Sequence, residues 1–247
     1  MKEINIIIPT YNEGKNILFI VKAIKKKIPS SYICIVDDSK NTMIGSILEK
    51  AQLKKVLYIH RQNSKGRGSA VLFGFKSLLR NNKKQIFIEM DSDFSHDPGE
   101  LRRNIELFKT TKSDLLIASR YLKKSKIINW PITRKIFSKM SNTLAKTLLN
   151  INVSDYTNGF RIYSSRAVRL ILKKCGKIGD GFIILSEILL VLNVNKYKIN
   201  ETDSVFINRI RGKSNVSFSL IINSLFGLLK LYLTKKKYLI IKNKNEI

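Results

Sequence analysis

Hydrophobic residues gather in short runs along the chain, separated by longer stretches with helical spacing. Near-continuous apolar runs occupy residues 4–8, 32–36, 56–60, 86–90 and 115–118, as in strands buried on both faces of a sheet. Between these runs, apolar residues recur every three or four positions, as on a helix packed against a sheet. This alternation predicts an α/β fold, with a mostly parallel sheet, right-handed crossovers and flanking helices.

Two aspartates, Asp91 and Asp93, follow the apolar run at residues 86–90. In open α/β sheets the carboxyl ends of the strands form the ligand-binding edge. Two carboxylates there suit a divalent ion, and Mg²⁺ usually completes its coordination shell with water and substrate phosphate. The pair therefore indicates a metal-bound diphosphate. The alternative is a solvated acidic turn, because Asp97-Pro98 also forms a good helix start.

Other polar residues follow strands at the same predicted edge. Tyr11 and Glu13 lie in the turn after the first strand, and Asp38 follows the second. Arg120 follows the fifth strand, and a planar guanidinium can bind phosphate through two parallel hydrogen bonds. An ion pair with one of the two aspartates is the alternative for Arg120, and its position alone does not decide between them.

The second half of the chain combines a basic amphipathic segment with further strand and helix patterns. One predicted helix carries the single acid Glu187, and the sequence leaves open whether it lies buried near ligand or pairs with a lysine. The last predicted strand leaves Arg209 near a glycine-containing turn. These segments are residues 127–150 (basic and amphipathic), 155–163 (loop leading into a strand), 182–192 (helix) and 205–210 (strand).

Composition fits one sizeable α/β domain with an appendage, at 247 residues and 44% hydrophobic content. Lysine and arginine number 46 against 18 acids, a formal charge of +28, so the surface should attract polyanions or anionic membranes. Nucleic-acid binding is one interpretation of this charge. It leaves unexplained why acids gather at the strand ends, so no nucleic-acid partner is expected.

The cysteines and histidines show no metal-binding spacing. Cys34 lies in an apolar strand and Cys175 at a helix end, which makes a reducing compartment the default. His60 and His96 are isolated and are expected to have structural or surface roles. The amino terminus enters a strand directly, without the apolar core and cleavage site of a signal peptide, so secretion is not expected.

The apolar stretch at residues 218–233 is interrupted by polar residues. A transmembrane span needs about 20 predominantly apolar residues, so the pattern favours an in-plane amphipathic helix. Lysines 235–237 would anchor it at anionic headgroups. The alternative is a helix that closes the core of the domain, and a partner membrane protein could also cover this apolar stretch. We expect one domain at residues 1–215 and a basic amphipathic tail at 216–247.

Taken together, the motifs resemble those of family 2 glycosyltransferases, and more narrowly of the dolichol-phosphate (polyprenyl-phosphate) mannose synthases. They occur in that family's order and at its approximate spacing, from residue 4 to about residue 215. So many ordered motifs are far more specific than any one alone. The matching stretches are IIIPTYNE, IVDDS, KGRGSAVLFGF, MDSDFSHDP, ASRY, RKIFS, DYTNGFRIY and FINRIRGKS.

The resemblance implies a Rossmann-like, GT-A type nucleotide-diphospho-sugar transferase fold with a catalytic domain at residues 1–215. It implies transfer of a hexose, mannose from GDP-mannose in the first instance, to a dolichyl or polyprenyl phosphate. The transfer would be inverting and would need Mg²⁺ or Mn²⁺. The implied residues are Asp91, Asp93 and Arg120 for catalysis; Asp91 and Asp93 for the metal; Pro9, Tyr11, Glu13, Val36, Asp38, Asp91, Ser92, Asp93, Arg120 and Arg209 for the donor; and Arg120, Arg134 and Ser138 for the acceptor phosphate.

Some positions depart from the family pattern. The turn after Val36 reads DDSKNT where the family usually has a Gly-Ser-Pro-Asp-Gly type turn. Asn158 stands where Ser is usual. Asn215 occupies the position at which a Lys often follows the family's Arg-x-x-Gly-x-Ser motif, so that lysine's phosphate contact is missing here. Lys213 is close enough to compensate for it.

The expected acceptor removes the need for a protein base. A phosphate monoester has its second pKa at about 6, so its oxygen is largely ionised at neutral pH. A polyprenyl-phosphate glucosyltransferase is the nearest alternative. A family 2 enzyme acting on a carbohydrate hydroxyl is another, and it would need an acidic base such as Asp97 or Glu187.

The expected location follows from the lipid acceptor that the resemblance implies. It is the cytoplasmic face of a membrane, which would be the endoplasmic reticulum in a eukaryote, with the protein held peripherally at the membrane surface. The sequence leaves open whether a small membrane-anchoring subunit takes part.

Overall fold

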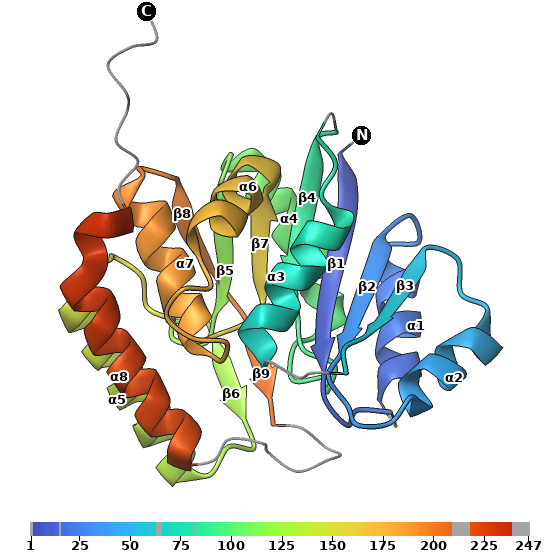
Figure 1. Ribbon diagram of the computed structural model, residues 1–247, viewed down its shortest axis with the longest axis horizontal. Coiled ribbons are helices and arrows are strands. Elements are labelled where there is room, and N and C mark those ends of the chain that lie inside the picture. The colour runs from blue at the N-terminus through green and yellow to red at the C-terminus, as the bar shows by residue number, and fades with distance from the viewer. Residues whose placement is uncertain (1, 15, 63–65, 82, 209–217, 239–247) are drawn as a thin grey trace, which may run out of the picture.

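The computed structural model describes residues 2–14, 16–62, 66–81, 83–208 and 218–238, with side chains of the last segment from residue 223. A seven-stranded sheet forms its centre (Figure 1). The sheet strands are β1 (Glu3–Thr10), β2 (Tyr32–Asp37), β3 (Val56–His60), β4 (Gln85–Glu89), β5 (Leu115–Ser119), β7 (Arg161–Ser164) and β8 (Ile199–Asp203), while β6 (Lys126–Ile128) and β9 (Val205–Ile207) form a small parallel sheet.

The order of the strands in the large sheet is β3-β2-β1-β4-β7-β5-β8. Every pairing in it is parallel except those of β7, which runs antiparallel between β4 and β5. Helices cover both faces. The predicted α/β fold class is therefore confirmed, although the sequence patterns did not predict the antiparallel strand.

The helices fill the predicted crossovers and the carboxyl-terminal half (Figure 1). Each predicted helical pattern corresponds to one of them. They are α1 (Ile17–Lys27), α2 (Met43–Ala51), α3 (Arg67–Leu78), α4 (Leu101–Thr110), α5 (Ile132–Leu149), α6 (Ser165–Lys174), α7 (Ile183–Val194) and α8 (Phe218–Thr234), with the 3₁₀ helices η1 (Pro98–Glu100) and η2 (Lys235–Tyr238).

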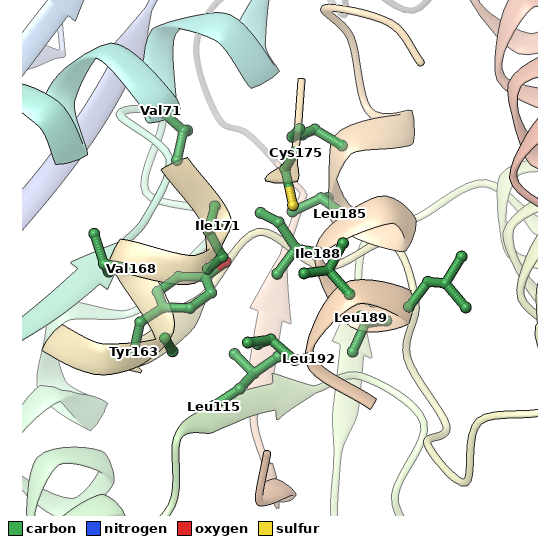
Figure 2. Close-up of a cluster of buried hydrophobic side chains, with 14 of the residues drawn as sticks. Val71, Leu115, Tyr163, Val168, Ile171, Cys175, Leu185, Ile188, Leu189 and Leu192 are labelled. Carbon is green, nitrogen blue, oxygen red and sulfur yellow. The ribbon is translucent and has the colours of Figure 1, made fainter. Parts of the chain in front are cut away.

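The sheet separates two hydrophobic cores. Along β1, Ile6 and Ile8 point into one core and Ile7 into the other, as the two-residue period of a strand requires. Both faces are buried, which explains why the strands read as continuous apolar runs. In the larger core, shown in Figure 2, residues of α6 and α7 pack over Leu115 and Tyr163 of the sheet.

Some predicted segments differ in detail from the structure. The basic segment at 127–150 begins with β6 and a Pro131 turn, and its helix starts only at Ile132. The loop at 155–163 leads into β7 as expected. The strand predicted at 205–210 is described as β9, and Arg209 lies outside the described residues.

Helix α8 lies beside α5 and also contacts α7 (Figure 1). Its Leu228 and Leu231 are buried in the larger core, whereas Phe226 and Leu233 are exposed. The buried face thus meets the expectation of a core-closing helix, whereas an in-plane helix at a membrane surface stays a prediction for the exposed face. Among the described helices, none combines the length and the apolar character that a bilayer-spanning segment needs.

Glu187, on α7, is fully buried. Its carboxylate accepts hydrogen bonds from the main-chain N–H groups of Gly176 and Lys177, at 2.8 and 3.3 Å, and from the Tyr238 hydroxyl, at 2.8 Å. Burial raises the pKa of this carboxyl, although the hydrogen bonds oppose the shift. Glu187 forms no ion pair with a lysine among the described residues, and its hydrogen bonds are structural. Through Tyr238 it links α7 to η2 at the end of the described chain.

Candidate active site

The parallel strands bring the predicted acidic residues to one edge of the sheet. Thr10 of β1 is paired in register with Asp37 of β2, and β4 runs parallel to β1 on its other side. The loops that leave these strands carry Glu13, Asp38 and Asp91. These residues therefore lie at the same edge of the sheet, because the carboxyl ends of parallel strands share an edge.

Asp91 is held by an arginine that sequence reasoning did not identify. Arg67, the first residue of α3, donates to Asp91 Oδ1 from Nε at 3.2 Å and from Nη2 at 2.7 Å. Its Nη1 pairs with Glu89, which is fully buried and also accepts a hydrogen bond from Tyr163. Burial opposes the charge on Arg67, but the two carboxylates outweigh it and raise the pKa of the guanidinium.

Gly159 makes room for this arginine. A Cβ atom at position 159 would lie 2.0 Å from Nη2 of Arg67, so a larger residue would displace the guanidinium. The Arg67 Cζ atom also lies 5.6 Å from the ring centre of Phe182. The glycine of the DYTNGFRIY stretch is therefore explained by the position of Arg67.

His96 supports the main chain at Asp91. The Asp91 N–H donates to Nδ1 of His96 at 3.0 Å, so the ring proton lies on Nε2, which donates to Oδ1 of Asn158 at 2.9 Å. The ring is buried and stacks on Phe160. The structural role predicted for His96 is confirmed, and Asn158, which departs from the family pattern, is its hydrogen-bond partner.

Asp93 is buried beside a small cavity. Its Oδ1 accepts hydrogen bonds from the main-chain N–H of Ser95 at 3.0 Å and from its hydroxyl at 2.6 Å. Ser92, between the two aspartates, is also buried. The cavity has a volume of about 220 Å³ and is lined by Asp93, Phe94, Asp97, Pro98, Ile207 and Asn208.

Asp91 and Asp93 are the candidate ligands for a divalent ion. Within the described residues, no three or more His, Cys, Asp or Glu side chains come together as a metal-binding group. Asp91 and Asp93 supply two carboxylates, the number that Mg²⁺ commonly takes from a protein when substrate phosphate and water complete its shell. The residues therefore fit an ion that binds together with a diphosphate, and no other protein ligand is required.

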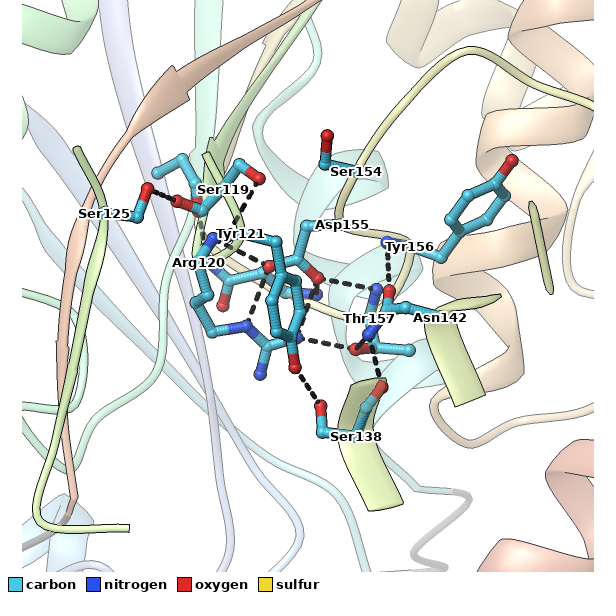
Figure 3. A network of polar contacts seen from close by, with 12 residues as sticks. Ser119, Arg120, Tyr121, Ser125, Ser138, Asn142, Ser154, Asp155, Tyr156 and Thr157 are labelled. Carbon is cyan, nitrogen blue, oxygen red and sulfur yellow. Dashed lines mark hydrogen bonds and ion pairs between the residues drawn. The ribbon is translucent and has the colours of Figure 1, made fainter. Parts of the chain in front are cut away.

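Arg120 is buried in an ion pair, but not with the partners expected. Its Nε and Nη2 donate to the two carboxylate oxygens of Asp155 at 2.8 and 2.7 Å (Figure 3). Burial would raise the pKa of Asp155, but Arg120 lowers it overall. The alternative of a pair with Asp91 or Asp93 is wrong. Nη2 also donates to Thr157, whereas Nη1 makes no hydrogen bond to the described part of the chain.

The three residues expected at the acceptor phosphate lie close together. Arg120 and Arg134 both lie against the ring of Trp130, with Cζ to ring-centre distances of 5.5 and 4.1 Å. The hydroxyl of Tyr121, the residue after Arg120, donates to Ser138 Oγ at 2.6 Å (Figure 3). Arg120, Arg134 and Ser138 thus lie close together although β6 separates them in sequence, and we call them the basic cluster.

The residues expected around the nucleotide are less uniform. Tyr11 is exposed, while Glu13 accepts a hydrogen bond from Asn16 at 2.7 Å. Asp38 is buried, and Arg61 binds both its oxygens, at 2.6 and 2.5 Å. The Val36 side chain is fully buried in the larger core, so this residue can line a pocket only through its main chain.

Pro9 is partly buried near the end of the neighbouring strand, β1, where it is paired in register with Val36. The expected donor contact at Arg209 lies outside the described residues.

Several site residues, Asn208 among them, were not identified by sequence reasoning. Arg61 directly follows β3 and Arg67 begins α3, where no site residue was expected, and Asp155 begins the DYTNGFRIY stretch, which carried no expected role for it. Trp130 could have been recognised from the sequence, because it is the single tryptophan of the chain and directly precedes a proline at a helix start.

Comparison with known proteins identifies the family. Residues 5–172 match Glycosyl transferase family 2. A polyprenol monophosphomannose synthase of Mycolicibacterium smegmatis is 32% identical over 224 residues, covering 90% of this chain and 83% of that protein. An undecaprenyl-phosphate mannosyltransferase of Micrococcus luteus is 31% identical over 218 residues, covering 87% and 88%.

Solved structures support the same fold at low sequence identity. Mannosyl-3-phosphoglycerate synthase from Rubrobacter xylanophilus aligns with a TM-score of 0.66 and 12% identity, over 100% of this chain and 78% of its own. Glucosyl-3-phosphoglycerate synthase from Mycobacterium tuberculosis, in complex with Mn²⁺, UDP and phosphoglyceric acid, aligns with a TM-score of 0.63 and 13% identity, over 98% and 80%. The match over most of the chain confirms the expected family: the chain belongs to glycosyl transferase family 2 and is a glycosyltransferase with a GT-A type fold.

Proposed function

We propose that the protein transfers mannose from GDP-mannose to the phosphate of a polyprenyl or dolichyl phosphate, with inversion. The observation that carries this proposal is the junction of the acidic edge and the basic cluster at Asn208. This residue lines the cavity beside Asp93 and accepts a hydrogen bond from Arg134 at 2.9 Å. A donor diphosphate at the carboxylates and an acceptor phosphate at the arginines would therefore be neighbours.

On the donor side, Asp91 and Asp93 would hold Mg²⁺ or Mn²⁺, which would supply positive charge next to the departing diphosphate. His96 and Arg67 fix the main chain and the carboxylate of Asp91. Tyr11, Glu13, Asp38 and the main chain at Val36 contribute to the nucleotide pocket, as do Pro9, Ser92 and Arg209. The relatives named as mannosyltransferases support mannose as the transferred sugar.

On the acceptor side, Arg120, Arg134 and Ser138 bind the phosphate. Its oxygen is already ionised at neutral pH, so it can attack the anomeric carbon without a protein base. A single displacement of this kind inverts the anomeric configuration. The exposed Asp97 caps η1 by accepting the Gly99 N–H at 2.7 Å, a structural role that requires no part in proton transfer.

Helices α5 and α8 support contact with a membrane. Their neighbouring outer surfaces, called here the α5–α8 face, expose large apolar side chains, and exposed lysines of both helices and of η2 accompany them. Such a surface suits the boundary of an anionic leaflet. The apolar members are Ile132, Ile136, Phe137, Met140 and Leu144 of α5 and Leu225, Phe226, Leu229, Tyr232 and Leu233 of α8.

We place the protein peripherally at the cytoplasmic face of a membrane, with residues 216–247 as part of its anchor and residues 1–215 as the catalytic domain. In a eukaryote this membrane would be the endoplasmic reticulum. Arg134 and Ser138 belong to the same helix as half of the α5–α8 face, so docking would bring the acceptor cluster near the lipid headgroups. A small membrane-anchoring subunit is the alternative cover for this face.

The test is incubation of the purified protein with polyprenyl phosphate and a panel of labelled sugar nucleotides, with Mg²⁺ or Mn²⁺ present. We expect label from GDP-mannose in the lipid fraction, and none when the acceptor is the unphosphorylated prenol. Label from UDP-glucose instead would establish the glucosyltransferase alternative. Label on a soluble carbohydrate acceptor, with none in the lipid, would refute a phosphate acceptor.

A further inference from the structure

Trp130 occupies a fixed position at the start of α5. Asn129 has a left-handed backbone, with φ of 60°, and Pro131 forms the N-cap of the helix. The helical conformation is disfavoured before proline, which favours an extended backbone at Trp130. Its side chain is buried, with only 6% of the residue exposed.

The indole ring lies against two charged groups of the basic cluster. The Arg134 guanidinium lies 4.1 Å and that of Arg120 5.5 Å from its centre, both within the range of a cation–π interaction. The ring of Phe206 packs edge-on at 5.2 Å. Arg134 also donates to the amide oxygen of Asn208 at 2.9 Å, and Arg120 forms an ion pair with Asp155. Trp130 thus fixes where the Arg134 guanidinium lies.

The indole N–H has no acceptor among the described residues, although it is buried. Buried tryptophan N–H groups usually find a partner, because an unmade hydrogen bond in a dry site is unfavourable. A donor without a partner beside two guanidinium groups is the chemistry of an oxyanion site. A ligand oxygen would satisfy the N–H and add negative charge next to Arg134.

We propose that Trp130 belongs to the acceptor-phosphate site. Its ring holds Arg134, and its Nε1–H donates to an oxygen of the bound phosphate monoester. This inference rests on the proposed function, because it takes the bound anion to be the phosphate of the lipid acceptor. Trp130 itself is not among the residues assigned to the donor, so its effects should appear in acceptor binding.

Substitution separates the two contributions of Trp130. Trp130→Phe keeps a ring under Arg134 and removes the N–H, whereas Trp130→Leu removes both. Loss of a hydrogen bond to a charged group should raise the KM for polyprenyl phosphate about tenfold in Trp130→Phe. The Leu variant should show a larger increase. The KM for GDP-mannose should change less than twofold in both.

Phe73→Leu, at an exposed aromatic residue of α3, serves as the matched control and should leave both KM values unchanged. Thermal unfolding of each variant checks that it folds. An acceptor KM in Trp130→Phe within twofold of the wild-type value would overturn the inference.

A binding experiment tests the site without transfer. Because the chain has 1 tryptophan, its indole fluorescence reports on Trp130 alone. Titration with a short, water-soluble prenyl monophosphate should change the emission saturably, and the matching prenyl alcohol should not. No response to the monophosphate would overturn the inference, as would an equal response to inorganic phosphate, which would mean a general anion site. A saturable response without transfer from any sugar nucleotide would support the phosphate site and refute the proposed function.

Discussion

At the scale of residues, the acidic edge depends on charges that balance one another. Arg67 stands between buried Glu89 and partly exposed Asp91, so one guanidinium serves two carboxylates. The positions of Asp91 and Asp93 could be predicted, because each follows a strand end in sequence. Arg67 and Asp155 could not, because they meet Asp91 and Arg120 across 24 and 35 residues of chain, respectively.

Arg67→Met should destabilise the protein because it leaves Glu89 buried without a counter-ion. Removing one partner of a buried pair costs about 3–5 kcal/mol, and we expect a loss of that order in the free energy of unfolding, measured by urea denaturation. The double variant Arg67→Met, Glu89→Gln should recover part of the loss. Equal stability of the single variant and the wild type would contradict this account of the site.

Two glycines allow a matched test of where the Arg67 guanidinium lies. Gly159→Ala places a methyl group where Nη2 of Arg67 lies, whereas a Cβ at Gly181 meets nothing within 4 Å. We expect Gly159→Ala to lower the free energy of unfolding by about 1–3 kcal/mol, as overpacking does, and Gly181→Ala to stay within about 0.5 kcal/mol. Equal effects of the two substitutions would show that Arg67 does not constrain position 159.

The ion pair of Arg120 with Asp155 gives a pH dependence. The pKa of Asp155 lies below its ordinary value of 3.8, so the pair stabilises the fold fully above that pH and loses this contribution as the pH falls through the lowered pKa. Asp155→Asn should lower the free energy of unfolding at neutral pH by about 3–5 kcal/mol, because it leaves Arg120 buried without a counter-ion. The difference from wild type should shrink below pH 3.8. Urea titrations between neutral and acid pH measure it, and a difference independent of pH would exclude the pair as its source.

At the scale of elements, the buried parallel strands were predictable because their apolar runs are continuous. Strand β7 was harder to place, because it has only 4 residues and begins with a charged one. Arg161 is fully buried there, and its guanidinium donates to the main-chain oxygens of Tyr156, Asn158 and Leu185. These contacts come from the fold, so no local pattern reveals an antiparallel strand between β4 and β5.

Helix α8 offers a matched pair of leucines on opposite faces. Leu231 is fully buried in the larger core, whereas Leu233 is 72% exposed. Leu231→Ala should lower the free energy of unfolding by about 2–5 kcal/mol, the range for a buried leucine, and Leu233→Ala by no more than about 0.5 kcal/mol. If both variants unfold like the wild type in urea, α8 does not pack as described.

At the scale of the whole molecule, the charge of +28 and the α5–α8 face point to the same kind of surface. The sequence alone could not show which face of the tail helix closes the core, because apolar side chains lie on both faces. The packing of α8 on α5 and α7 shows which face is buried, and a membrane role for the exposed face stays a prediction. The expected contact at Arg209 stays a prediction, since it lies outside the described residues.

Membrane binding should depend on both charge and apolar contact. Binding to vesicles with anionic lipid should weaken as salt is raised, because charges separated by more than about 10 Å are largely screened at 0.1 M ionic strength. Phe226→Ser, at an exposed residue of the α5–α8 face, should reduce vesicle binding in sedimentation assays without lowering stability. Unchanged binding of this variant, or equal binding to neutral vesicles at every salt concentration, would argue against the face as the docking surface.

The most direct test of the central claim compares wild-type protein with Asp93→Asn in mannose transfer from labelled GDP-mannose to polyprenyl phosphate, each with a divalent ion and with a chelator. We predict lipid-linked label from the wild type only when the ion is present, and almost none from the variant, although both fold. Label that persists in the chelator, or in Asp93→Asn, would contradict a catalytic centre built on this carboxylate pair.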